Sequence, residues 1–495
     1  MDGDRGAEGG DVSSLLDAKD AEIAVLAARN AVFSTRIAEL EGLIAALRAQ
    51  LGRDSSHSGK PPSSDSPFVK KPAPKRSSRI RSGRSRGGQH GAPGSTLPMV
   101  DDPDETIVHE PSSCRGCGDP LAGAEVFGVA RHQVFDVPPV PPRPHVTEHR
   151  VVARTCGGCG TTTAAPADGV PAGRVQYGPR VSARAVWLSC AHFLPVRRAR
   201  SVLNALCGLE VSDGWVAGVR GDAARLLEQQ FLPRVRELIA AAPVAHADET
   251  TARADGALRY LHVAATEHLT AMHVGDRTKE TIDAAGIWPA FTGVLVRDGY
   301  AGYEHLDRVE HAWCGIHLVR DLRSVHDPDP AGQTWADAMV TTLLAANTTA
   351  HTARAQGRDT LTEQELSAIR ARYAGAIAAG WDENRTGRDP LHAQARTLLR
   401  RFHRHRNMIL RFAVNLAVPF TNNTAELPAR SAKVQQRTSG GCWRTIQGLV
   451  DFAVVQSYLS TTTKWGINTL DAMTRLFTTS AWIPTGLTPT QPIAA

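Results

Sequence analysis

Apolar residues recur every seven positions near the start of the chain, between residues 14 and 51. β-branched residues are frequent at one position of this heptad and leucine at the other, a pattern that favours a parallel two-stranded coiled coil. A single Asn30 in the first seam sets the register of such a coil at some cost in stability. We therefore predict a coiled coil over residues 14–51 that forms a homodimer or a higher oligomer. The alternative is an amphipathic helix that folds back on its own chain.

A second pattern, of short strands that reach an acidic residue, organises residues 243–303. Residues 243–251 alternate apolar and polar positions and carry Asp248, and residues 293–298 form an apolar run that ends at Asp298. Carboxylates at the ends of neighbouring strands can share a divalent cation, and without a cation they repel each other until one takes up a proton. The alternative is a pair of unrelated surface aspartates.

Helical patterns precede this stretch and fill residues 173–242. Gly208 is expected to end one helix and Ser212 to cap the next. The three expected helices cover 182–193, 197–207 and 213–231. Arginines are expected on their outer faces, at positions 197, 198, 200, 220 and 225. This arrangement is typical of a helix-turn-helix DNA-binding module, and a module that only packs between two domains is equally consistent with it.

Further helices are expected after the central strands, in residues 325–418, as an all-helical insertion. A third acidic residue, Glu426, follows this insertion. Asn423 and Glu426 have the spacing of a helix N-cap and its third residue, so a capping box is the simplest structural interpretation. Arg430, Lys433 and Arg437 then fall on the same helix face as Glu426 and form a basic stripe suited to phosphate contacts.

The charge composition of the chain predicts a polyanionic partner such as DNA. The 495 residues exceed one ordinary domain, and Lys plus Arg (56) outnumber Asp plus Glu (50). The excess gathers in residues 52–98, which we predict to be a disordered basic linker that contacts DNA phosphates. Its arginines include Arg79, Arg81, Arg84 and Arg86. No apolar run is long enough to cross a membrane, and the acidic N-terminus does not match a signal peptide, so no membrane partner is expected.

Two Cys-x-x-Cys pairs lie between the linker and the helical module. We predict that Cys114, Cys117, Cys156 and Cys159 hold one structural Zn²⁺ in a small β-rich domain over residues 99–172. The alternative is four reduced thiols without metal. Farther along, Cys314 and His317 can ligate metal, but two ligands do not make a site, and they are alternatively a support for the neighbouring strand.

The order of these motifs resembles the DDE-type transposases of the bacterial "sixty-six" family of insertion sequences. The resemblance rests on a Ser-Gly-Lys-Pro-Pro-Ser-Ser-Asp segment (58–65), the paired cysteines, and four short motifs that lie beyond residue 240. These motifs are Ala-Asp-Glu-Thr (247–250), Arg-Asp-Gly-Tyr (297–300), Cys-x-x-His (314–317) and Asn-Asn-x-Ala-Glu (422–426). The downstream runs 433–441 and 457–461 also match. The chain is thus expected to be a multidomain α+β protein with an RNase H-like mixed α/β catalytic domain over residues 243–480.

The resemblance also implies an activity and its site. Asp248, Asp298 and Glu426 are the implied catalytic residues and the ligands of Mg²⁺ or Mn²⁺, supported by Cys314, His317, Asn422 and Asn423. The implied reaction is cleavage at the ends of the element and strand transfer into target DNA. Accessory proteins of the same element are further candidate partners, and the bacterial nucleoid in the cytoplasm is the expected location.

One departure from the family pattern lies directly after the third acidic residue. Leu427 and Pro428 stand where the family usually has arginine and a residue compatible with a helix. A catalytically decayed DNA-binding protein of a mobile element is therefore one alternative. An RNase H-like nuclease without strand transfer is another.

Overall fold

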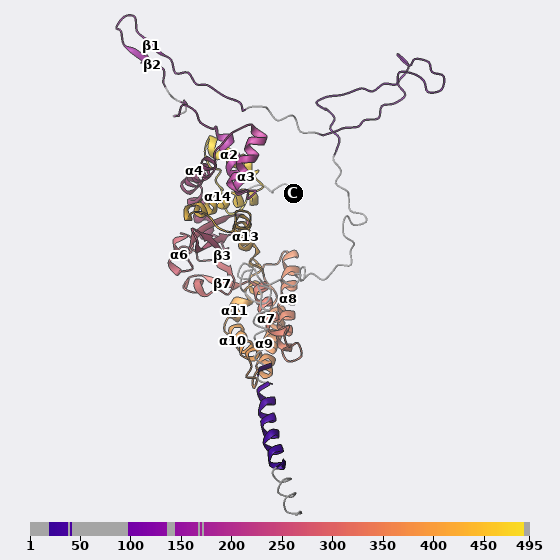
Figure 1. The fold of residues 1–495 in the computed structure, drawn as a ribbon, viewed down its shortest axis with the longest axis vertical. Coiled ribbons are helices and arrows are strands. Elements are labelled where there is room, and N and C mark those ends of the chain that lie inside the picture. The colour runs from indigo at the N-terminus through magenta and orange to yellow at the C-terminus, as the bar shows by residue number, and fades with distance from the viewer. Residues whose placement is uncertain are drawn as a thin grey trace, which may run out of the picture. The chain divides into compact units, whose positions relative to one another are not determined.

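The computed structural model describes residues 19–37, 40–41, 98–135, 144–166, 169–170 and 173–489 (Figure 1). The chain divides into two compact units, one formed by Pro67–Pro142 and the other by Met1–Ser66 with Arg143–Ala495. Residues 19–37 are helical with exposed side chains, and these include the seam residues Ile23 and Leu26. Other parts of the sequence predictions lie outside the described residues. These are residues 14–18, 38–39 and 42–51 of the predicted coiled coil, and most of the basic linker with its four arginines.

A five-stranded mixed sheet forms the centre of the second unit, in the order β5-β4-β3-β6-β7. Its strands are β3 (Val244–Ala254), β4 (Ala257–Ala265), β5 (Thr270–Gly275), β6 (Val294–Arg297) and β7 (Glu310–Trp313). The first three strands run antiparallel to their neighbours, whereas β6 runs parallel to β3, and β7 runs parallel to β6. The two-residue turn from β3 to β4 is Asp255-Gly256, and both residues have positive φ, as a tight hairpin turn requires.

Two hydrophobic cores cover the two faces of this sheet, as the alternation of side chains along a strand dictates. Leu295 of β6 lies in the first core, and its neighbours Val294 and Val296 lie in the second. Figure 1 shows β3 and β7 between helices α2, α4 and α14 on one side and helices α7 to α10 on the other.

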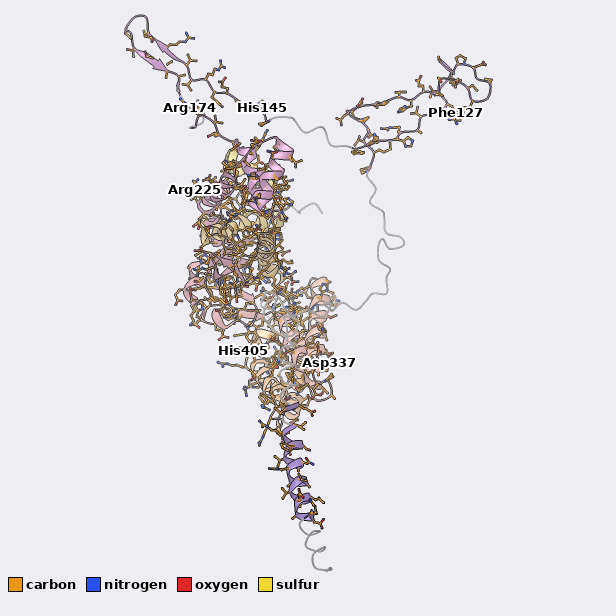
Figure 2. The ribbon with its side chains drawn as sticks, viewed as in Figure 1. Phe127, His145, Arg174, Arg225, Asp337 and His405 are labelled. Carbon is orange, nitrogen blue, oxygen red and sulfur yellow. The ribbon has the colours of Figure 1, made fainter. Side chains whose placement is uncertain are left out.

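The helices of the first core come from both ends of this unit. They are α2 (Pro179–Cys190), α3 (Val196–Cys207), α4 (Asp213–Gln230), α5 (Leu232–Ala240), α6 (Lys279–Ala284), α13 (Asn423–Thr438), α14 (Ile446–Lys464) and α15 (Thr469–Thr478). Gly208 ends α3 in the left-handed region, and the Ser212 hydroxyl accepts a hydrogen bond from the Trp215 amide at 3.1 Å, so both expected helix boundaries are confirmed. Arg225 is exposed on α4 (Figure 2).

The second core is helical between β7 and α13. Its helices are α7 (Gly315–His326), α8 (Thr334–Ala355), α9 (Glu363–Glu383), α10 (Pro390–Arg404), α11 (Arg406–Ile409) and α12 (Arg411–Val414). The expectation of long helices in residues 325–418 is met. Among the described residues, no helix is both long and apolar enough to cross a membrane.

Each cysteine pair forms the same tight turn. In the first, the amide of Gly118 donates to the carbonyl of Cys114 at 2.9 Å, and in the second the amide of Gly160 donates to the carbonyl of Cys156 at 2.9 Å. Both glycines have positive φ. The second turn joins β1 (Ala153–Thr155) to β2 (Thr162–Ala164). The two turns belong to different compact units, and a shared zinc ion stays a prediction.

Candidate active site

The sheet register brings Asp248 and Asp298 to the same level. Strands β3 and β6 pair in parallel with His246 opposite Val296 as the last pair, and Asp248 and Asp298 each lie two residues beyond that pair. Val294 and Val296 lie in the second core, and alternation therefore directs the side chains of both aspartates towards that same side of the sheet. Asp298 lies directly after the last residue of β6, where the strand gives way to a turn.

Glu426 approaches from the first turns of α13. The N-cap of this helix is Asn422, and its side chain makes no capping bond. The expected capping box at Asn423 and Glu426 is therefore wrong, because Glu426 is the fourth helical residue and its carboxylate faces Cys314 and His317 instead.

The side chain of Asn422 is fully buried and joins α13 to β3. Its Nδ2 donates to the carbonyl of Ala247 at 2.8 Å, and its Oδ1 lies 3.0 Å from Nδ1 of His246. Because an amide oxygen only accepts, Nδ1 of His246 carries the proton in this bond. Burial lowers the pKa of His246 to about 4, so the ring is neutral near pH 7. These bonds fix the start of α13 directly beside Asp248.

The three carboxylates affect one another electrostatically. Burial raises the pKa of Asp248 well above its usual range, and the negative charges of Glu249, Asp298 and Glu426 raise it further. Such crowding favours protonation or a bound cation. Carboxylate oxygens are the ligands that Mg²⁺ prefers, so the residues present fit a hard divalent cation.

An acidic residue that the sequence analysis did not single out, Glu249, lies next to Asp248. Its carboxylate forms an ion pair with Arg277, whose guanidinium stacks on the Tyr300 ring at 3.8 Å. The Tyr300 hydroxyl donates to the carbonyl of Arg277 at 2.7 Å, and the Tyr300 amide donates to Oδ1 of Asp298 at 2.8 Å. Burial raises the pKa of Glu249 to about 7, Asp298 adds to this, and Arg277 opposes it. The network thus joins β3 to the turn that carries Asp298.

Arg297 holds the same turn from the other side and is fully buried. Its Nη1 donates to the carbonyls of Asp298 at 3.0 Å and Tyr300 at 2.7 Å, and its Nε donates to Nδ1 of His311 at 3.1 Å. Burial lowers the pKa of Arg297, and the neighbouring Asp298 opposes that shift. Two arginines therefore restrain the turn at Asp298. The Arg-Asp-Gly-Tyr motif pointed to the aspartate alone.

Cys314 and His317 flank Glu426 at the start of α7. The Sγ atom of Cys314 lies 3.8 Å from Oε1 of Glu426, and Nδ1 of His317 lies 3.6 Å from the same oxygen. The Asn422 amide donates to Sγ of Cys314 at 3.3 Å. Burial raises the pKa of Cys314 to about 11, and the Glu426 carboxylate contributes to the rise.

Glu426 completes a cluster of three potential metal ligands with these two residues. Among the described residues, Cys314, His317 and Glu426 form the one group of three or more potential ligands with atoms all within 4.8 Å of one another. Asp248, Asp298 and Glu426 do not meet that limit in this conformation.

The basic stripe on α13 contains two exposed arginines and one lysine whose ammonium is hydrogen-bonded within the protein. Arg430 and Arg437 are exposed. Lys433 is half-buried, and its ammonium donates to the backbone carbonyl of Thr251 and, at 2.7 Å, to its hydroxyl. Burial lowers the pKa of Lys433 to about 8, and Arg437 contributes to the shift. The two arginines are thus available to a polyanion, whereas Lys433 joins α13 to β3.

Comparisons with known proteins identify the family. The model of the Transposase IS66 family matches residues 174–450, which is more than half of the chain. A family of unknown function, DUF6444, matches residues 12–98. A search of curated proteins returned no match. The matched transposase region contains the central sheet, the turn at Asp298 and the start of α13. The chain belongs to the IS66 family of transposases.

Proposed function

We propose that this transposase cuts DNA at the ends of its insertion sequence and joins the freed ends to target DNA. The observation that carries the proposal is the placement of three carboxylates, Asp248 on β3, Asp298 directly after β6 and Glu426 on α13, near enough that the charges of the last two raise the pKa of Asp248. In the proposal these residues hold Mg²⁺ or Mn²⁺ and act as the catalytic triad.

The topology of the sheet supports an RNase H-like catalytic domain. Three antiparallel strands are followed by two strands parallel to the first, in the order β5-β4-β3-β6-β7. The first aspartate lies on the central strand, the second follows its parallel neighbour, and the glutamate comes from a helix after the helical insertion. This is the arrangement that a DDE-type transposase uses to bring three distant acidic residues to one edge of a sheet.

The proposed reaction has two in-line displacements at phosphorus. In the first, a water oxygen attacks the phosphate at the element end, the bond to O3′ breaks, and O3′ takes up a proton. In the second, the freed 3′-hydroxyl loses its proton and attacks a phosphate of target DNA, whose own bond to O3′ breaks. Divalent cations, when bound, stabilise the attacking and leaving oxygens of such displacements.

The chain's own residues contribute position and charge in these steps. Asp248 and Asp298 are held level by the register of β3 with β6, and Asn422 fixes the start of the helix that bears Glu426. Arg430 and Arg437 lie exposed one and three turns after Glu426, where they can neutralise DNA phosphates. No side chain is needed as a nucleophile, so no covalent protein–DNA intermediate forms.

The decisive experiment follows cleavage and joining of a labelled element-end duplex in Mg²⁺. Wild type is expected to give joined product, and Glu426→Gln and Asp248→Asn are expected to give none while they still bind the duplex. Asp337→Asn is the matched control, since Asp337 is exposed on α8 (Figure 2). Undiminished cleavage by both site variants would overturn the assignment.

The departure at Leu427 and Pro428 does not favour a decayed protein. Helix α13 continues through Pro428 to Thr438, so the proline does not end the helix that positions Glu426. A wild-type protein that binds the duplex but neither cuts nor joins it would reverse this conclusion. Cleavage without joined product would favour a nuclease.

A further inference from the structure

Three side chains of different chemistry converge at the junction of α7 and α13. The sulfur of Cys314 and Nδ1 of His317 lie 3.8 Å and 3.6 Å from the same oxygen, Oε1 of Glu426. The thiol contact is a long hydrogen bond, and the contact of His317 is too long to be one. Nδ1 of His317 is buried and has no hydrogen-bond partner, which is unusual for a ring nitrogen inside a protein.

The scaffold around these atoms is rigid. Cys314 is the N-cap of α7, and His317 follows three residues later, in the first turn of the same helix. The amide of Gly315 donates to the carbonyl of Phe420 at 2.8 Å, and the amide of Asn422 donates to Sγ of Cys314 at 3.3 Å. These two bonds join α7 to the segment that leads into α13, so the backbone positions that carry the three side chains are held together.

The two separations that involve Oε1 of Glu426 match those of a tetrahedral zinc site, and all three ligand atoms lie within 4.8 Å of one another. Bonds of about 2.3 Å to sulfur and about 2.0–2.2 Å to nitrogen or oxygen place neighbouring ligand atoms roughly 3.4–3.6 Å apart. The observed 3.6 Å and 3.8 Å are close to these values. Thiolate, imidazole and carboxylate are ligands of Zn²⁺, whereas Mg²⁺ prefers oxygen alone. The three protein ligands would leave one coordination position open.

We infer that Cys314, His317 and Glu426 form a binding site for Zn²⁺ or a similar borderline-soft divalent cation. The inference that this site opposes DNA cleavage rests on the proposed function. A cation bound there holds the Glu426 carboxylate towards α7 and so withdraws it from Asp248 and Asp298. Glu426 is then shared by two sites of different ligand preference, and a soft cation inhibits a reaction that depends on a hard one.

Cobalt binding by the full-length protein tests the site directly. Co²⁺ takes the place of Zn²⁺ and gives a thiolate charge-transfer absorption. Wild type is expected to bind one equivalent more than Cys314→Ser, and part of the thiolate absorption is lost in the variant. Loss of an outer-shell partner already weakens metal binding by about 10–100-fold, so loss of the thiolate should weaken this equivalent by at least about 100-fold.

The control is Cys442→Ser, which removes a different thiol, one that is partly buried and directed at the carbonyl of Trp443. This control should bind as many equivalents of Co²⁺ as wild type. The predicted zinc site of the four other cysteines is present in all of these proteins, so it does not contribute to the difference between wild type and a variant. His317→Ala is a second variant that should lose the same equivalent. Equal cobalt binding by wild type, Cys314→Ser and His317→Ala would overturn the inference.

A measurement on the unmodified chain covers the case in which the variants do not fold. The bound Co²⁺ should include one equivalent whose thiolate charge-transfer absorption is that of a single sulfur ligand, weaker per metal ion than the absorption of a site with four cysteines. Bound Co²⁺ with four-thiolate absorption only would also overturn the inference.

The inhibitory role has its own test. In Mg²⁺, added Zn²⁺ should reduce cleavage by wild type at least tenfold more than cleavage by Cys314→Ser, if the weakened affinity sets the difference. Equal inhibition of both proteins would refute the inhibitory role. Failure of wild type to cut without Zn²⁺ would instead count against the proposed function, and the cobalt measurement would still stand.

Discussion

At the scale of single residues, Asn422 joins α13 to β3 at the candidate site. Its side chain bonds the carbonyl of Ala247 and the ring of His246, both next to or near Asp248. Asn422→Ala would leave these buried groups without partners, at a cost of about 1–3 kcal/mol for each. We expect urea denaturation to show that loss, whereas Asn423→Ala, at the exposed first position of α13, should cost much less. A larger effect at Asn423 would restore the capping interpretation.

A second residue-scale prediction concerns Lys464, at the end of α14. Its ammonium donates to the carbonyls of Thr266 at 2.8 Å and Leu269 at 2.9 Å, and burial lowers its pKa to about 7. An unfolded lysine has a pKa of about 10.4. Between these values the unfolded chain binds more protons than the folded one, so this lysine makes the free energy of unfolding rise with pH.

The measurement compares wild type with Lys464→Met by denaturation at pH 7 and pH 9.5. The stability of wild type relative to the variant should increase at the higher pH, because the buried lysine becomes neutral while its unfolded form stays charged. Lys279→Met, at an exposed position, serves as the control. A difference that does not change with pH would show that the ammonium stays charged when buried.

At the scale of elements, the start of α7 depends on a residue without a side chain. A Cβ at Gly315 would lie 2.1 Å from the ring of Phe420, which is buried and packs against Phe412 at 4.8 Å. Because the ring has no free space, Gly315→Ala should cost about 1–3 kcal/mol of unfolding free energy. The control is Gly375→Ala in α9, where no atom lies within 4 Å and alanine should stabilise the helix by about 0.5–1 kcal/mol. Equal effects of the two substitutions in thermal unfolding would refute the argument.

Local sequence signals predicted where helices and turns begin and end better than they predicted the contacts between these elements. The stop at Gly208 and the cap at Ser212 depend only on neighbouring residues, and both were predictable. The turn Asp255-Gly256 carried an equally local hairpin signal. The N-cap of α13 was misjudged by one residue because the side chain of Asn422 is used for a tertiary contact with β3. Such a contact cannot be predicted from the residues next to Asn422 in the sequence.

The candidate site shows the same division. Short motifs around Asp248 and Asp298 pointed to the two aspartates, because the first lies within a strand pattern and the second directly after one. Glu249 and Arg277 were missed, since their ion pair joins residues far apart in the sequence and only the folded sheet brings them together. The approach of Glu426 to Cys314 likewise depends on the packing of α7 against α13, which the spacing of residues within each motif does not specify.

At the scale of the whole molecule, the candidate site lies where the two cores of the sheet-containing unit meet. Helix α13 places Ala425, Ala429 and Ala432 in the first core, while Phe420, just before it, lies in the second. Asp248 and Asp298 extend from strands shared by both cores. The position of Glu426 relative to the two aspartates thus depends on packing in both cores.

The last prediction concerns assembly through the helix at residues 19–37. Its seam residues Ile23, Leu26, Phe33 and Ile37 are each more than half exposed. Burial of apolar surface stabilises an assembly by about 25 cal/mol per Å², so a second copy of the helix is the expected partner of these residues. Leu26→Lys combined with Phe33→Lys places charges in the seam and should reduce the mass in sedimentation equilibrium to that of a monomer. Ala28→Lys adds charge on the opposite face and should leave the mass of wild type unchanged. An unchanged mass in the double variant would mean that another surface holds the copies together, and a monomeric wild type would exclude the coiled coil as a dimer contact.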